Sequence, residues 1–177
     1  MTEDIAITTA AIAEDWRGDY GAAFVAPGSD GAPFRTEAEA LAAVYSGMTT
    51  GLEFTVNARL GRPLGTFERP RPTRAEARRS GRALRHVLIS LQSNAALAAI
   101  LSAEHPEQAA EIAAAFDRAE EVALRLDDPA LESVADPSGR LRVETLQQRV
   151  TNARDTARLS IGPTLGIAEG FNALDGD

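Results

Sequence analysis

The sequence predicts an all-α fold, an antiparallel four- to five-helix bundle with a docked C-terminal tail. Apolar residues recur at helical spacing in five segments, helix-start and turn residues separate these segments, and no segment shows the two-residue alternation of a β-strand. With 177 residues the chain can bury a sizeable core without cross-links. Residues 1–177 are therefore expected to form a single helical-bundle domain.

The apolar stripes place the five helices at about 5–24, 41–55, 84–98, 112–126 and 143–161. Thr36-Glu-Ala-Glu39 and Thr73-Arg-Ala-Glu76 have the pattern of capping boxes, in which a hydroxyl and a carboxylate bond the free N–H groups of a helix start. Pro106 and Asp136-Pro137 suit the starts of the last two helices, because proline is tolerated at the first helical position. These signals predict where the helices begin.

Composition excludes several classes of protein. The chain has a net charge of −8 and no cysteine, so it has no disulfide, no thiol nucleophile and no cysteine-based zinc site. It begins without a basic and apolar leader, and no stretch is expected to be apolar enough to cross a membrane. The acidic charge and the lack of lysine and of interleaved aromatic residues argue against nucleic acid as a partner.

Arginine is concentrated in one stretch of this acidic chain. Nine of the 18 basic residues, all of them arginine, fall between Arg59 and Arg85, with only Glu68 and Glu76 as acids there. The nine are Arg59, Arg62, Arg69, Arg71, Arg74, Arg78, Arg79, Arg82 and Arg85. The guanidinium fork suits carboxylate and phosphate, which favours an anion-binding surface. The alternative is that these residues pair with acids elsewhere in the fold.

The second and third predicted helices carry small polar side chains opposite their apolar stripes. The polar faces comprise Ser46, Thr50, Glu53 and Asn57 on one helix, and Arg79, Arg82, His86, Ser90 and Ser93 on the other. Such faces indicate a surface that meets a ligand or a partner, and the alternative is an ordinary solvent-exposed face.

Metal and catalytic templates find little support. The two histidines, His86 and His105, belong to neither a His-Glu-x-x-His nor a Glu-x-x-His motif. The C-terminal segment from Gly162 combines apolar anchors with Asn172, Asp175 and Asp177, whose oxygens suit a hard cation or the arginine-rich stretch. We expect this tail to dock against those arginines.

Three blocks resemble the imelysin-like family, an iron-regulated bacterial family formerly classed as peptidases. Gly170-Phe-Asn-Ala-Leu-Asp-Gly-Asp177 is similar to the family's closing motif. Gly51-Leu-Glu-Phe54, followed by Arg59-Leu-Gly-Arg-Pro-Leu-Gly65, resembles the segment that opens its second half, and Arg79-Ser80-Gly-Arg-Ala-Leu84 resembles the next helix. The blocks occur in the family's order, and the resemblance spans about Trp16 to Asp177.

The resemblance implies a periplasmic protein built from two related helical bundles and linked to iron uptake, with iron or haem as ligand. The family's Gly-x-His-x-x-Glu signature is absent from this chain, which therefore resembles the C-terminal bundle only. Its patterned positions correspond here to Glu53, Arg59, Arg79, Ser80, Asn172, Asp175 and Asp177. A missing N-terminal bundle, or a second copy of the chain, would complete an inter-domain cleft.

These observations favour a non-catalytic bundle that binds a ligand or metal and serves iron uptake. The expected ligand-binding residues are Glu53, Arg59, Arg79, Ser80, Arg82, His86 and Asn172, with Asp175 and Asp177 as metal ligands. The expected ligand is iron or an anionic chelate. The alternatives are a structural or dimerising interaction module and a metal-dependent peptidase.

Overall fold

The structure, a computed structural model, describes residues 2–167, and all regular structure within that range is helical, which confirms the predicted fold class. Asn172, Asp175 and Asp177, with the docked tail predicted around them, lie outside the described residues. The chain divides into two compact units, residues 1–44 and 45–177, which are described separately.

The first unit contains two helices, α1 (Thr2–Arg17) and α2 (Asp19–Phe24), and the start of α3 (Glu37–Phe54). The prediction of one continuous helix over 5–24 is wrong, because the backbone departs from helical geometry at Gly18. Gly21 lies so close to the carbonyl of Trp16 that a Cβ could not fit there. The rings of Trp16 and Tyr20 meet edge to face, with centroids 4.8 Å apart. The predicted apolar stripe therefore becomes an aromatic cluster that folds α2 against the end of α1.

The predicted capping box at Thr36 is confirmed for its hydroxyl, whereas its carboxylate bonds one residue earlier than the motif predicts. Thr36 Oγ1 accepts a hydrogen bond from the backbone N–H of Glu39, and the Glu39 carboxylate accepts one from the backbone N–H of Arg35. The first bond satisfies a donor that the first turn of α3 would otherwise leave unpaired, and the second fixes the residue that precedes the cap.

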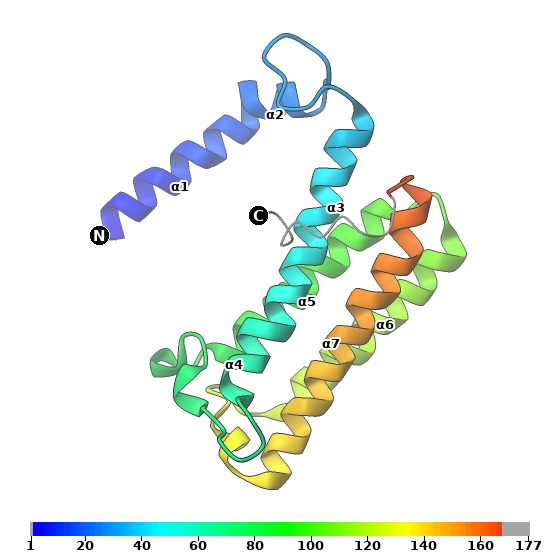
Figure 1. Cartoon of the computed structure of the whole chain (residues 1–177). Helices are drawn as coiled ribbons and strands as arrows, with labels where there is room; N and C mark the ends of the chain where they lie inside the picture. The colour runs from blue at the N-terminus through cyan, green and yellow to red at the C-terminus, as the bar shows by residue number, and fades with distance from the viewer. Residues whose placement is uncertain (1, 168–177) are drawn as a thin grey trace. The chain divides into compact units, whose positions relative to one another are not determined.

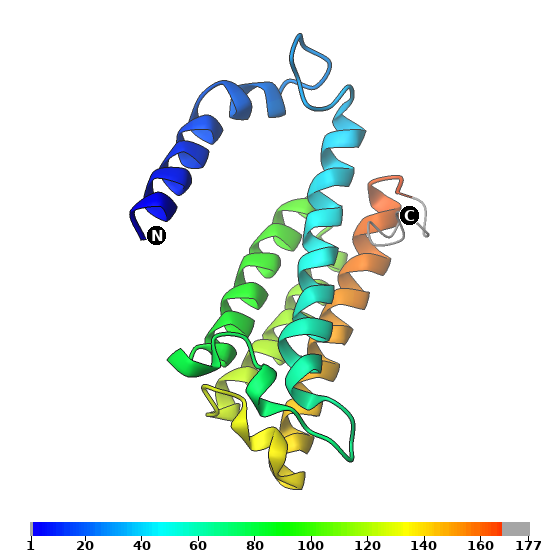
Figure 2. The ribbon, with the colours of Figure 1, turned by 60° about the vertical axis from the view of Figure 1, so that its left-hand side comes forward.

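In the second unit α3 continues through a π-helix, η1 (Thr55–Leu60), into α4 (Gly61–Leu64). Three further helices run beside it, α5 (Ala83–Leu101), α6 (Pro106–Leu126) and α7 (Pro137–Thr164), with sequence neighbours antiparallel (Figures 1 and 2). Short 3₁₀ turns occupy the connections, namely η2 (Pro72–Arg74), η3 (Arg78–Ser80) and η4 (Glu132–Ala135). The predicted starts at Pro106 and Pro137 are confirmed, and Asp136 Oδ2 accepts a hydrogen bond from the Gly139 N–H.

The core of this unit is aliphatic, as the low aromatic content predicts. Its completely or almost completely buried side chains include Met48, Leu52, Leu60, Val87, Leu91, Ile112, Leu146, Val150 and Ile161. Alanines on α6 and α7, such as Ala119 and Ala153, lie between the larger residues and let the helices approach closely.

The predicted capping box over Thr73–Glu76 is wrong. Ala77 and Gly81 have positive φ angles of 51° and 61°, which a continuous α-helix does not allow. The helix α5 therefore begins only at Ala83. Glu76 instead turns toward Arg59, a charged partner that outweighs a local backbone bond.

Helix α5 is long and apolar enough, with a mean hydropathy of 1.3, to cross a membrane by length and composition alone. This contradicts the expectation that no stretch is so apolar. The reason is that α5 carries apolar residues on both sides: Val87 and Leu91 face the core, whereas Ile89 and Ile100 are exposed.

Candidate ligand-binding site

A π-helical turn marks the candidate site. Thr55–Leu60 continues α3 with wider hydrogen-bond spacing, a rare geometry that is frequent at functional sites. Thr55 is fully buried and its hydroxyl donates a hydrogen bond to the Gly51 carbonyl, with an oxygen–oxygen distance of 2.9 Å. Arg59 lies one turn further along, and its Nη1 donates a hydrogen bond to Thr55 Oγ1 at 3.1 Å.

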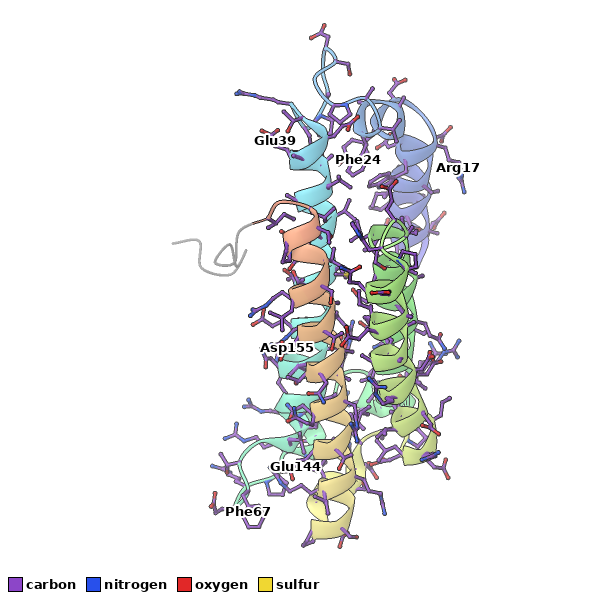
Figure 3. The ribbon with its side chains drawn as sticks, turned by 90° about the vertical axis from the view of Figure 1, so that its right-hand side faces the viewer. Arg17, Phe24, Glu39, Phe67, Glu144 and Asp155 are labelled. Atoms are coloured by element: carbon purple, nitrogen blue, oxygen red, sulfur yellow. The ribbon has the colours of Figure 1, made fainter. Side chains whose placement is uncertain are left out.

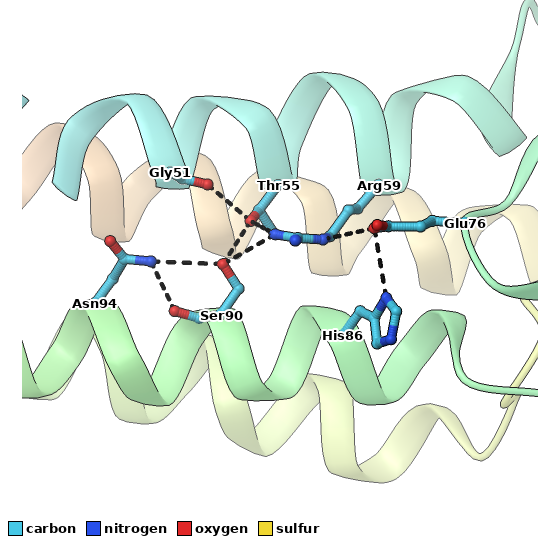
Figure 4. A network of polar contacts seen from close by, with 7 residues as sticks. All are labelled: Gly51, Thr55, Arg59, Glu76, His86, Ser90 and Asn94. Atoms are coloured by element: carbon cyan, nitrogen blue, oxygen red, sulfur yellow. Dashed lines mark hydrogen bonds and ion pairs between the residues drawn. The ribbon is translucent and has the colours of Figure 1, made fainter. Parts of the chain in front are cut away.

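The buried end of the site joins this turn to α5 (Figure 4). Ser90 Oγ lies 2.9 Å from Thr55 Oγ1 and accepts a hydrogen bond from Arg59 Nη1 at 3.2 Å. Because the Thr55 hydroxyl donates its only proton to the Gly51 carbonyl, the Ser90 hydroxyl must be the donor in the bond between Ser90 and Thr55. Asn94 donates to the Ser90 carbonyl at 2.7 Å. Each hydroxyl therefore has a defined donor and acceptor role.

The other end of the site is open to solvent. Arg59 Nε donates to Glu76 Oε2 at 2.8 Å, and His86 Nδ1 lies 3.5 Å from the same oxygen. The side chains of Arg59, His86 and Glu76 are 22%, 33% and 44% exposed. The Phe54 ring covers the guanidinium, with its centroid 5.0 Å from Cζ. Thr55, Arg59, Glu76, His86, Ser90 and Asn94 thus form one chain of contacts, here called the Arg59 network, which leads from the core to a carboxylate and an imidazole at the surface.

The Glu76 carboxyl is held in its ionised form. Partial burial opposes ionisation, but the hydrogen bonds and charges of Arg59 and His86 outweigh it, so the pKa of Glu76 lies below its ordinary value of 4.5. A negative charge therefore persists at the open end at neutral and mildly acidic pH.

Because its pKa is lower in the folded state, Glu76 stabilises the fold above pH 4.5, and this contribution disappears as the pH falls through the folded-state pKa. Urea unfolding followed by circular dichroism is expected to show that Glu76→Gln lowers the unfolding free energy at pH 7. The difference between the two proteins should shrink by pH 3. A difference that stays the same at both pH values would contradict the role given to the ionised carboxylate.

The structure brings together only some of the residues predicted for the site. Arg59 and His86 meet through Glu76, as described above. Glu53 lies outside the network, where it accepts a hydrogen bond from Asn57 at 3.4 Å and lines a separate surface pocket of about 270 Å³. Arg79 and Ser80 occupy the exposed turn η3, and exposed Arg82 directly precedes α5. Ser80 Oγ donates to the Ala77 carbonyl, a local bond within that turn.

Three members of the network escaped the sequence-based prediction. Thr55 is the last residue of the helix predicted over 41–55 from its apolar stripe, Glu76 belongs to the predicted capping box Thr73–Glu76, and Asn94 belongs to no predicted site. A polar residue at a stripe position was the available signal, since a buried hydroxyl requires a partner. The partners themselves come from α5, which sequence spacing within one helix does not reveal.

Of the arginine-rich stretch, two residues form ion pairs within the described residues, Arg59 with Glu76 and Arg78 with Glu132. Both distances are 2.8 Å. Among residues 2–167, pairing with acids elsewhere in the fold thus accounts for two of the nine arginines. Between residues 2 and 167 no three His, Asp or Glu side chains are grouped to hold a metal ion.

Comparison with known proteins gives one family. The family model Peptidase_M75, described as Imelysin, matches residues 1–157, a range that includes every member of the Arg59 network. No curated protein and no solved structure matches the chain. The match covers most of the sequence and agrees with the resemblance carried by the blocks at Gly51, Arg59 and Arg79. The chain belongs to the imelysin family.

Proposed function

We propose that this chain is a ligand-binding helical bundle of a periplasmic imelysin-like protein that serves iron uptake, with no catalysis of its own. The observation that supports this proposal most directly is the ionised Glu76 carboxylate beside His86, held by Arg59 at the open end of the Arg59 network. Family membership supports the connection to iron and to the periplasm.

The chemistry of the open end favours iron that arrives with other ligands. A carboxylate oxygen and an imidazole nitrogen both suit iron, and Glu76 and His86 offer one of each. Two side chains leave most of the coordination sphere to other groups. We assign these to an anionic chelate or to a second bundle, either an N-terminal bundle or another copy of this chain. Asn172, Asp175 and Asp177 remain further candidates.

The hydroxyl groups of the network support binding rather than catalysis. A serine nucleophile needs a neighbouring base to take its proton. The proton of Ser90 is directed to the Thr55 hydroxyl, and Arg59, which also contacts Ser90, is a permanent cation. No observation within the site favours the peptidase alternative.

Isothermal titration calorimetry tests this proposal with ferric nitrilotriacetate, ferrous iron, zinc and haem. The wild-type chain is expected to bind at least one iron probe, and Glu76→Gln to weaken that binding about tenfold, the loss of one charged contact. Glu132→Gln is the matched control, because Glu132 also accepts from an arginine but lies outside the network. Absence of binding to every iron probe, or equal binding by the Glu76 variant, would overturn the proposal.

A further inference from the structure

A polar groove lies on another part of the bundle, between α6 and α7. Its volume is about 490 Å³, within the range of small-molecule sites. It is lined by Glu111, Ala115 and Arg118 of α6 and by Arg149, Asn152, Asp155, Thr156, Leu159 and Ser160 of α7. This α6–α7 groove shares no residue with the Arg59 network. Figure 3 shows the two helices side by side, with Asp155 labelled on α7.

The groove follows from residue size and helical spacing. Glu111, Ala115 and Arg118 stand at intervals of four and three along α6 and therefore share one face. Ala115 is buried at 4% exposure between the two charged residues, and its small side chain leaves space where a larger one would fill the interface. The α7 residues form the facing stripe, and the helices are the most extensively packed pair in the unit.

The charges in the groove are unequal once the ion pairs are assigned. Asp155 is neutralised by Arg154, whose Nη2 lies 2.9 Å from its carboxylate. Arg118 and Arg149 form no ion pair with any residue of the described chain. Two arginines, one from each helix, therefore face the groove against a single unpaired acid, Glu111.

Neutral hydrogen-bonding groups complete the lining. The Asn152 carbonyl oxygen accepts a bond from Gln148, which leaves the Asn152 amide N–H groups available as donors. Thr156 and Ser160 add hydroxyls on the same side. Two guanidinium forks with amide and hydroxyl groups in the same groove match an organic ligand that carries several anionic groups and further polar atoms.

We propose that the α6–α7 groove binds a small organic polycarboxylate. Arg118 and Arg149 bind its carboxylates, and Asn152, Thr156 and Ser160 bind its other polar atoms. The site is distinct from the iron-binding proposal, since the two share no residue and the groove is expected to bind a polycarboxylate without iron.

The test is calorimetric titration of the full chain with citrate, succinate and inorganic phosphate. We expect citrate to bind, and Arg118→Gln and Arg149→Gln each to weaken its binding about tenfold, the loss of one charged contact. Glu111→Gln should tighten citrate binding, since it removes a negative charge from the wall. Arg125→Gln is the matched control, an exposed arginine of α6 that pairs with Glu121 away from the groove.

Three results would overturn the proposal: no binding of citrate or succinate, weakening by Arg125→Gln equal to that by Arg118→Gln, or binding of phosphate alone. All four variants alter groove-edge or surface polar side chains, so circular dichroism should show an unchanged fold. Because Glu76→Gln leaves the groove intact, loss of iron binding in that variant with normal citrate binding separates the two sites.

Discussion

Arg140→Gln is expected to lower the free energy of unfolding by about 3 kcal/mol, because it removes charged hydrogen bonds from buried carbonyls. Arg140 is 8% exposed at the start of α7. Its Nη1 donates to the Leu64 carbonyl at 2.6 Å and to the Thr66 carbonyl at 3.1 Å, while Nε donates to Glu144 at 2.7 Å. Glutamine is too short to reach these acceptors, and the Leu64 carbonyl would remain buried without a partner.

Arg142→Gln is the matched control for Arg140. Arg142 lies two residues further along α7, is exposed, and makes no hydrogen bond to another described residue. We expect it to change the unfolding free energy by less than about 0.5 kcal/mol. Urea denaturation followed by circular dichroism measures both variants. Equal effects would show that general charge, rather than the carbonyl contacts, accounts for the loss.

The position of Arg140 also connects stability to the candidate site. Leu64 and Thr66 lie at the end of the helical segment that begins with η1 and carries Arg59. Arg140 therefore anchors the far end of that segment to α7, and the Phe67 ring lies 5.8 Å from its Cζ. Figure 3 shows Phe67 and Glu144, which flank this anchor, at the same end of the bundle. Loosening the anchor should also weaken the hold of Arg59 on Glu76.

The helices of the bundle were predictable because their signals are local. Apolar residues such as Leu84, Val87 and Leu91 repeat at the spacing of one helical face, and Pro106 satisfies a rule that concerns a single turn. At the predicted capping box over Thr73–Glu76, a contact between distant residues decided the structure. The sequence around Glu76 fits a capping box, but its carboxylate accepts a hydrogen bond from the guanidinium of Arg59, 17 residues away, instead of capping a helix.

The candidate site was predictable only as a set of faces. The sequence identifies the polar residues His86 and Ser90 on one helix face, and Arg59 through the arginine-rich stretch and the family resemblance. The contact between these residues depends on the π-helix, which turns both Thr55 and Arg59 toward Ser90 of α5. No residue pattern signals a π-helical turn as a capping box signals a helix start. The α6–α7 groove escaped prediction for a related reason, since it exists where a small residue, Ala115, meets a facing helix.

Gly139→Ala is expected to lower the unfolding free energy by about 2–3 kcal/mol, the range for inserting an atom into a filled interior. Gly139 is buried in the first turn of α7, where its N–H is bonded to Asp136. An added Cβ would lie 2.6 Å from the Ser133 Cβ and 2.8 Å from the Ser133 carbonyl carbon, so backbone would have to move. That backbone belongs to η4, which buries Val134 in the core.

Gly47→Ala is the same chemical change, but it is expected to stabilise the protein where Gly139→Ala destabilises it. Gly47 lies within α3, is exposed, and a Cβ there meets no atom within 4 Å. Alanine should raise the unfolding free energy by about 0.5–1 kcal/mol, because it restricts the unfolded chain and favours helix. Thermal and urea unfolding of both variants then separates helix propensity from steric fit. If Gly139→Ala also stabilised the protein, the close contact of η4 with the first turn of α7 would be refuted.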